Sequence, residues 1–183
     1  MRPVMKLLHD DLIRKIISEA RHILCSTGME IHNTDVLSIL SDHGADVEMD
    51  TQHLTFTDEM IDQALHTVPG SFKLYDIHGN ETHDFSGNRV HFTPGSSALN
   101  ILDGRTNQIR RPTTDDYIRY VKIVHQLGNL ASQSTAFIPA DVHEDMSDSY
   151  RLFLSLLYGA KPVVTGTFTM DGFPVMKDLQ LAV

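Results

Sequence analysis

An α/β fold is the class that this sequence predicts, mainly because of the order of its elements after Pro94. From there, apolar strand-like runs alternate with helical patterns, which is typical of parallel β/α units. Three such units can be counted, whereas a TIM (β/α)8 barrel needs eight over about 250 residues. We therefore expect a small α+β region over residues 1–93, followed over residues 94–183 by the first β/α units of an incomplete TIM barrel.

The N-terminal region begins with a strongly amphipathic helix, expected over residues 10–27. Apolar residues recur along it every three or four positions, and Gly28 provides the stop. Two shorter helices then flank a pair of short strands, with polar caps at their starts and Gly44 at the end of the first. The elements expected here are a helix after Asn33 or Thr34, strands at 45–49 and 53–56, and a helix after Thr57.

Residues 71–93 carry glycine- and asparagine-containing turns between alternating or apolar runs. This pattern predicts β-hairpins and a small antiparallel sheet. The later part should contain a helix that begins after Thr114, with two acidic residues in its first turn. The expected strands are 72–75, 82–85, 90–92, 98–102, 130–136 and 162–168, and the expected helices are 115–127, 148–158 and 172–182.

Composition excludes several classes of protein. The formal charge is −9 and no basic run exists beyond Arg110–Arg111, so a nucleic-acid surface is not expected. No signal peptide and no apolar run of 18 residues is present, so we expect no membrane span. The single Cys25 fits a reducing compartment. We expect a soluble, cytoplasmic protein.

Five segments in order resemble a known family: SILSDHGADVEMD, TDEMIDQALHTVPGSFKLYD, VHFTPGSSALNILDGRTNQIRRPTTDDY, IPADV and GAKPVVTGTF. Together they span roughly residues 15–170 and are similar to the N-terminal third of trimethylamine methyltransferases, which are corrinoid-dependent TIM-barrel enzymes. The resemblance implies transfer of a methyl group from a methylated amine (trimethylamine, glycine betaine or similar) to a corrinoid protein. It also implies that no cofactor binds this chain directly, because the cobalamin is carried by the partner.

The resemblance places no catalytic residue of the family on this chain, and we expect no metal site. Barrel enzymes bind substrates at the C-terminal ends of their strands. By that geometry, the best candidates for a substrate pocket are Ser134, Asp141, Thr165 and Thr167. A quaternary ammonium cannot donate a hydrogen bond, so aromatic faces and carboxylates are its natural partners.

The last residues stop within a helical pattern, so we expect the N-terminal fragment, or a truncated relative, of a longer enzyme, inactive alone. Its open strand edges should favour association with further copies. One alternative is a non-catalytic barrel module that acts as a binding or scaffold protein. Another is an unrelated β/α hydrolase or lyase that uses the Asp141 region.

Some residues have two interpretations. Arg110–Arg111 could bind an anion such as a substrate carboxylate, or could anchor a loop by bonding backbone carbonyls or the carboxylates of Asp103 or Asp116. The stretch 94–97 lacks a phosphate-binding motif. His78, His83 and His91 could converge from adjacent hairpin strands, yet their spacing matches no metal motif. The acidic loop 141–144 could face a pocket or simply the solvent.

Overall fold

The computed structural model describes residues 6–182. Backbone contacts divide the chain into two compact units, Met1–Pro69 and Gly70–Val183, and each is treated by itself. The hairpin region 71–93 groups with the second unit in this division. The boundary expected at residue 93 marks a change in element order, and it stays a prediction. Within residues 6–182, no helix has the length and apolar composition needed to cross a membrane.

The first unit combines helices with a small antiparallel sheet. Strand β3 lies in the centre, with β1 on one side and β2 on the other. The elements are α1 (Asp10–His22), a π-helical turn (Ile23–Thr27), β1 (Met29–Glu30), α2 (Thr34–Asp42), β2 (Asp46–Glu48), β3 (His53–Thr55) and α3 (Asp58–Thr67). The helix expected over 10–27 thus ends in a widened turn at Gly28, and β1 was not predicted.

Caps and a small core explain this unit. The Asn33 side chain accepts two backbone N–H groups at the start of α2, and Thr57 accepts one at the start of α3. Both caps confirm the sequence prediction. Leu37 of α2 and Leu54 of β3 are fully buried and belong to the same apolar cluster. Their burial fixes the register of the strands, because a shift by one residue would expose Leu54.

Helix α1 is amphipathic, as its sequence predicts, but no residue of α1 is buried. Ile16 and Ile17 are 50% and 54% exposed. Arg21 forms ion pairs with Asp58 and Asp62 of α3, so α1 is joined to its unit by charge contacts at its C-terminal end. The apolar pattern predicted the helix correctly but not a buried position.

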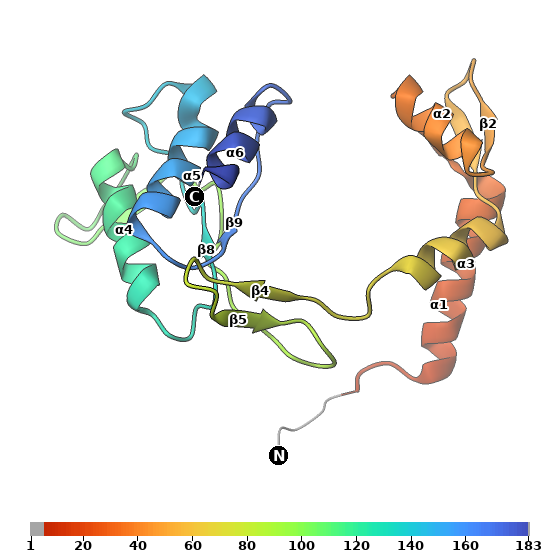
Figure 1. Cartoon of the computed structure of the whole chain (residues 1–183), viewed down its shortest axis with the longest axis horizontal. Coiled ribbons are helices and arrows are strands. Elements are labelled where there is room, and N and C mark those ends of the chain that lie inside the picture. The colour runs from red at the N-terminus through yellow and green to blue at the C-terminus, as the bar shows by residue number, and fades with distance from the viewer. Residues whose placement is uncertain (1–5, 183) are drawn as a thin grey trace. The chain divides into compact units, whose positions relative to one another are not determined.

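The second unit contains two hairpins, three long helices and a short parallel strand pair. Helices α4, α5 and α6 lie next to one another beside β8 and β9 (Figure 1). The elements are β4 (Lys73–Tyr75), β5 (Glu81–Asp84), β6 (Ile101–Asp103), β7 (Gln108–Arg110), α4 (Thr114–Gln126), β8 (Gln133–Ser134), a 3₁₀ turn (Glu144–Met146), α5 (Ser147–Tyr158), β9 (Val163–Val164) and α6 (Gly172–Leu181). The three expected helices are confirmed within one residue.

Mixed helix and strand content agrees with the expected α/β class, but the structure does not show an incomplete TIM barrel. Within residues 6–182, parallel pairing is limited to two residues between β8 and β9 and to isolated bridges from Phe92 to Leu130 and from Ala98 to Phe137. The extended segments therefore run in parallel without forming a continuous sheet. Apolar runs predicted extended backbone correctly, but they did not predict how few of its groups would pair.

The prediction of one continuous parallel strand over residues 98–102 is wrong. Ala98 forms only a parallel bridge, and Ile101–Asp103 turns away to pair antiparallel with Gln108–Arg110. The cause is the turn between them, where the Asp103 carboxylate accepts the N–H groups of Arg105 and Thr106. The strand expected at 90–92 is likewise reduced to the bridge at Phe92.

The core of the second unit lies between α4 and α5. Tyr117 and Val121 are fully buried and pack with Phe137 and Leu154. Burial raises the pKa of Tyr117 to about 12, and its hydroxyl shares a 2.9 Å hydrogen bond with Ser155. The two helices that form this core also contact the parallel strands, α4 at β8 and α5 at β9.

Candidate functional site

A cavity of about 390 Å³ lies at the C-terminal ends of β8 and β9. We call it the hydroxyl-lined cavity, because most of its walls are serine, threonine and glycine. Its volume falls in the range of small-molecule sites. It is lined by Thr93, Pro94, Gly95, Ser96, Ser97, Ser134, Thr135, Val164, Thr165, Gly166, Thr167 and Phe168.

Hydrogen bonds between its walls fix the shape of this cavity. The Ser134 hydroxyl donates to the carbonyl of Gly95 at 2.6 Å, and the hydroxyls of Thr135 and Thr165 lie 3.2 Å apart. Ser97 has φ +62°, a left-handed conformation that is uncommon for a residue with a side chain. Strained backbone of this kind often accompanies binding sites. These hydrogen bonds therefore join the three segments that line the cavity, 93–97, 134–135 and 164–168, without any ligand.

A buried ion pair on α5 supports the same walls. Arg151 is 1% exposed and donates to Asp148, and its Nη1 also donates to the carbonyl of Thr135 at 2.9 Å. The other oxygen of Asp148 accepts the backbone N–H of Phe168. The Arg151 guanidinium lies 5.5 Å from the centre of the Phe168 ring. The pair thus links α5 to the loops after both parallel strands.

The four predicted pocket residues fall in two places. Ser134, Thr165 and Thr167 line the hydroxyl-lined cavity. Asp141 does not line it, and both of its carboxylate oxygens accept the backbone N–H of Thr114 at the start of α4, at 2.9 and 3.1 Å. Substrate binding by these four residues stays a prediction.

Two other residues of the cavity, Thr135 and Phe168, were not singled out from the sequence. They belong to the loops that follow the parallel strands, so the rule that located Ser134 would have found them too. The stretch 94–97 was considered only as a phosphate-binding loop, and it lines the cavity. The left-handed backbone of Ser97 could not be predicted, because it depends on the loop that surrounds it.

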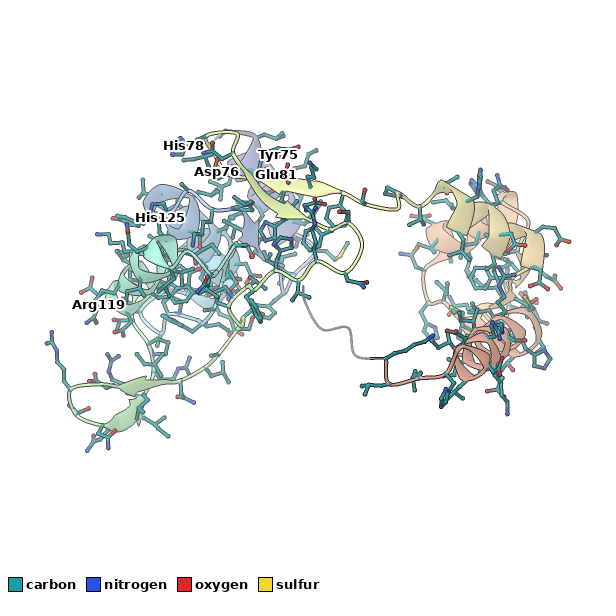
Figure 2. All side chains as sticks on the ribbon, turned by 90° about the horizontal axis from the view of Figure 1, so that it is seen from below. Tyr75, Asp76, His78, Glu81, Arg119 and His125 are labelled. Carbon is teal, nitrogen blue, oxygen red and sulfur yellow. The ribbon has the colours of Figure 1, made fainter. Side chains whose placement is uncertain are left out.

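Arg110 anchors a loop, as one of its two interpretations proposed. Its guanidinium donates to Asp103 at 2.6 Å and forms a two-point contact with Asp116 at 2.7 and 2.9 Å. These bonds hold the pKa of Asp103 down at about 2 and that of Asp116 well below its usual range. Arg119 projects from α4 (Figure 2) and adds a 2.6 Å contact to Asp116.

The histidines do not form a metal centre in the part of the chain that the structure describes, where no group of three or more metal-ligand side chains is found. His83 and His91 do come together, with ring centres 4.9 Å apart, and burial lowers the pKa of His83. His78 lies apart from them at the β4–β5 turn beside Asp76, which accepts its backbone N–H (Figure 2).

Comparison with known proteins identifies the family. The profile of the trimethylamine methyltransferase (MTTB) family matches residues 1–172. The chain belongs to the trimethylamine methyltransferase family. This confirms the resemblance drawn from its sequence segments.

Two curated relatives carry names of whole enzymes. Trimethylamine methyltransferase MttB of Desulfitobacterium hafniense (strain DSM 10664 / DCB-2) is 21% identical over 138 residues, which cover 75% of this chain and 28% of that protein. The glycine betaine methyltransferase of Desulfitobacterium hafniense (strain Y51) is 26% identical over 157 residues, covering 84% of this chain and 32% of that protein. This trimethylamine methyltransferase family chain thus spans about a third of the length of these relatives.

Proposed function

We propose that this chain contributes to a methyltransferase that moves a methyl group from a methylated amine, such as trimethylamine or glycine betaine, to a corrinoid on a separate protein. Family membership over residues 1–172 is the observation that carries this proposal. The names of the two relatives supply the substrate class. A cytoplasmic location and a corrinoid protein as partner belong to the same proposal.

The arrangement of the strands supports a barrel in the complete enzyme. Segments 92–98 and 130–137 are joined by parallel bridges, and β8 continues the series to β9. Each later segment is separated from the one before it by a helix, α4 or α5. This is the order of the first units of a (β/α)8 barrel. We propose that further strands of the same enzyme complete the pairing that is short here.

The hydroxyl-lined cavity suits the binding of a methylated ammonium group. No Asp, Glu, His, Lys or Arg is among the residues that line it, so it offers no acid or base for proton transfer. A quaternary ammonium needs none, because it is held by hydroxyl oxygens and by the face of an aromatic ring such as Phe168. Orientation of the methyl carbon is then the main contribution of these residues to the rate.

In this proposal the methyl acceptor is the corrinoid of the partner protein, which in its reduced form supplies the nucleophile that takes the methyl carbon from the amine. Cavities of about 390 Å³ accommodate small molecules and are far smaller than a corrinoid macrocycle. The residues present therefore fit the amine and not the corrinoid, which agrees with a corrinoid carried by the partner.

The competing proposal is a truncated, non-catalytic barrel module that binds a partner. The uncharged lining of the cavity is the observation that favours it, because such a site can bind without reacting.

One experiment separates the two proposals. An antibody raised against this chain would isolate the polypeptide that carries it from the cells that encode it. We expect this polypeptide to convert cob(I)alamin to methylcobalamin, followed by absorbance, when trimethylamine or glycine betaine is added. Folded polypeptide that gives no methylcobalamin with either amine would refute the methyltransferase and leave the binding module.

The 183-residue chain alone should behave differently. We expect it to form no methylcobalamin above the protein-free control, because its parallel strands pair over only a few residues and further strands are needed to complete the barrel around the reacting methyl group. The same absorbance assay tests this, and methyl transfer by the isolated chain would contradict it.

A further inference from the structure

An open groove of about 330 Å³ lies between helices α2 and α3 of the first unit. We call it the α2–α3 groove. Aliphatic side chains form most of its walls, and Ile39 at its side is 57% exposed. Exposed apolar surface of this kind is typical of a site that another protein covers. The residues that line the groove are Ile39, Leu40, His43, Met60, Gln63, Ala64 and Thr67.

Two of the polar side chains in the groove already bond to the helices that carry or precede them. The His43 ring donates from Nδ1 to the carbonyl of Ile39 at 2.7 Å. The Thr67 hydroxyl donates to the carbonyl of Ala64 at 2.9 Å. Because these groups are satisfied within the unit, the groove offers mainly apolar surface to a ligand. It therefore suits the side chains of a protein better than a small polar molecule.

Negative charge is concentrated in the same part of the chain. Residues 22–72 contain nine Asp and Glu and no Lys or Arg, so this stretch alone accounts for the whole formal charge of −9. The rest of the chain is balanced, with 15 basic and 15 acidic residues. Arg21, just before the stretch, pairs with Asp58 and Asp62. Within residues 6–182, the other seven acidic residues of the stretch form no ion pair with Lys or Arg.

Three of these seven carboxylates lie on the helix faces that form the groove. On α2, Asp35 and Asp42 lie four residues before and three residues after Ile39. On α3, Glu59 lies four residues before Gln63. Side chains at these spacings are neighbours on one face of a helix. All three carboxylates are exposed, so negative charge borders the apolar groove.

The length and the charge of the groove indicate what it can bind. Its α3 wall runs from Met60 to Thr67, which is about 10 Å along a helix axis. That length fits the side chains at i, i+3, i+4 and i+7 of a second helix, the usual anchors of an amphipathic helix in a groove. The acidic border favours Lys and Arg beside those anchors. A second copy of this unit would bring like charges together, and nucleic acid or an anionic membrane would be repelled.

We propose that the α2–α3 groove binds a basic amphipathic helix of a partner protein. The apolar side chains of that helix contact Ile39, Met60 and Ala64, and its Lys or Arg side chains face the three carboxylates at the border. The first unit thereby acts as a docking module. The groove belongs to the first unit and the hydroxyl-lined cavity to the second, so this interaction does not depend on the proposed methyl transfer.

Fluorescence anisotropy of labelled peptides tests the proposal with the 183-residue chain. The probe is a helical peptide of about 15 residues, made of leucine and lysine with the leucines on one face. One control peptide has the same composition with its leucines spread around the helix, and another has glutamate in place of lysine. We expect one probe per chain, and at least about ten-fold weaker binding of each control. Equal binding of the probe and the first control, or no binding of the probe by micromolar chain, would overturn the proposal.

Two apolar substitutions locate the bound peptide. Ile39 and Leu65 are 57% and 62% exposed, but only Ile39 lines the groove. Ile39→Ser should weaken the probe about ten-fold, whereas Leu65→Ser should leave its affinity unchanged. Circular dichroism should show the same helix content in both variants, because neither side chain is buried. Equal loss of affinity in the two variants would mean that the peptide adheres to exposed apolar surface in general, and the groove would lose its role.

A matched pair of charge substitutions tests the acidic border. Asp42→Asn removes a negative charge beside the groove, and Asp50→Asn removes one from the turn between β2 and β3. Asp42→Asn should weaken the probe several-fold at low salt and less at high salt, because salt screens exposed charges. Asp50→Asn should have a smaller effect. Equal effects would show attraction to the net charge of the unit alone and would contradict the proposal.

Other occupants of the groove give different results. We expect Ile39→Ser to leave any oligomers of the chain unchanged in light scattering. Their loss in this variant would make the groove an interface between copies, and the proposal would fail. We also expect the polypeptide isolated with the antibody to bind the probe. If the 183-residue chain binds the probe and that polypeptide does not, the groove is covered within the enzyme itself, and the proposal fails.

Discussion

Gly28 is the residue on which the first unit depends most locally. It has φ +68°, and a Cβ added there would lie 2.0 Å from the carbonyl oxygen of Leu54. Gly44 has φ +97°, but open space surrounds its added Cβ. Both positions favour glycine because of their backbone, and Gly28 alone also has no room. The two glycines therefore form a matched pair.

Gly28→Ala should destabilise the first unit by about 2 kcal/mol or more, because the backbone strain adds to a clash with the central strand. Gly44→Ala should cost only about 1 kcal/mol, from backbone strain alone. Hydrogen exchange at β3 measures the difference. All five tyrosines lie in the second unit and no tryptophan is present, so tyrosine fluorescence serves as the internal control. Equal effects of the two substitutions would show that the contact with Leu54 is unimportant.

Asp103 makes the stability of the second unit depend on acid pH. Its pKa in the folded protein is about 2, below its usual 3.8, because Arg110 donates to its carboxylate. A lowered carboxyl pKa gives stability that is present above the unfolded pKa and lost as the pH falls through the folded pKa. The thermal midpoint from tyrosine fluorescence should therefore fall between about pH 4 and pH 2.

Asp103→Asn keeps the turn acceptor for the Arg105 and Thr106 N–H groups but removes the charge. Its midpoint should be lower than that of the wild type at pH 7 and should fall less between pH 4 and pH 2. The same acid-induced fall in the wild type and in Asp103→Asn would contradict a role for this ion pair. Asp116 remains charged to lower pH, because Arg110, Thr113 and Arg119 all donate to it.

At the scale of elements, the side chain of one lysine caps the C-terminal end of helix α4. The Lys161 ammonium donates to the carbonyls of Val124, Leu127 and Leu130 at 2.6–2.7 Å. These groups lie at and just beyond the C-terminal end of α4, where carbonyls lack helical partners and the dipole favours a cation. Lys161 therefore joins the start of β9 to the end of α4.

Lys161→Met should destabilise the second unit by about 2 kcal/mol, because three carbonyls at the end of α4 lose a charged donor, and two of these hydrogen bonds are partly buried. Lys177→Met, at an exposed position of α6, should change stability by less than about 0.5 kcal/mol. Urea unfolding followed by tyrosine fluorescence measures both. Equal midpoints for the two variants would remove Lys161 from the account.

Helices were predicted from the sequence more accurately than strands, and the reason is physical. Caps such as Asn33 and Thr57 act on backbone groups within three residues, so their effect can be deduced locally. Strands depend on distant partners. The run 98–102 was apolar enough for a strand, but its pairing was decided by the turn at Asp103 and by Phe137. The β6–β7 hairpin was missed for that reason.

The candidate site was also predicted only where a general rule applies to the sequence, and not where distant contacts decide the position of a side chain. Ser134, Thr165 and Thr167 could be placed near one cavity because a rule relates strand ends to sites. Asp141 satisfied the same rule and lies instead at the N–H of Thr114, since a helix start nearby offers the carboxylate a donor. The sequence also could not show which arginine of the pair anchors the loop, and in the structure Arg110 forms the ion pairs with Asp103 and Asp116.

At the scale of the whole molecule, many apolar side chains remain exposed. Leu99 and Leu102 are 55% and 63% exposed, and Phe168 is 63% exposed. Exposed apolar groups and unpaired strand edges favour association. We expect the chain to form oligomers at high concentration, to be measured by light scattering after size-exclusion chromatography. A monomer over the whole concentration range would contradict this.

The most direct test of the methyltransferase follows the methyl carbon itself. The polypeptide isolated with an antibody to this chain would be incubated with cob(I)alamin and glycine betaine labelled with ¹³C in its N-methyl groups. The account predicts a ¹³C signal of a cobalt-bound methyl group, together with dimethylglycine in equal amount. Glycine betaine that stays intact in the presence of the folded polypeptide, with no ¹³C on cobalt from it or from labelled trimethylamine, would contradict the account.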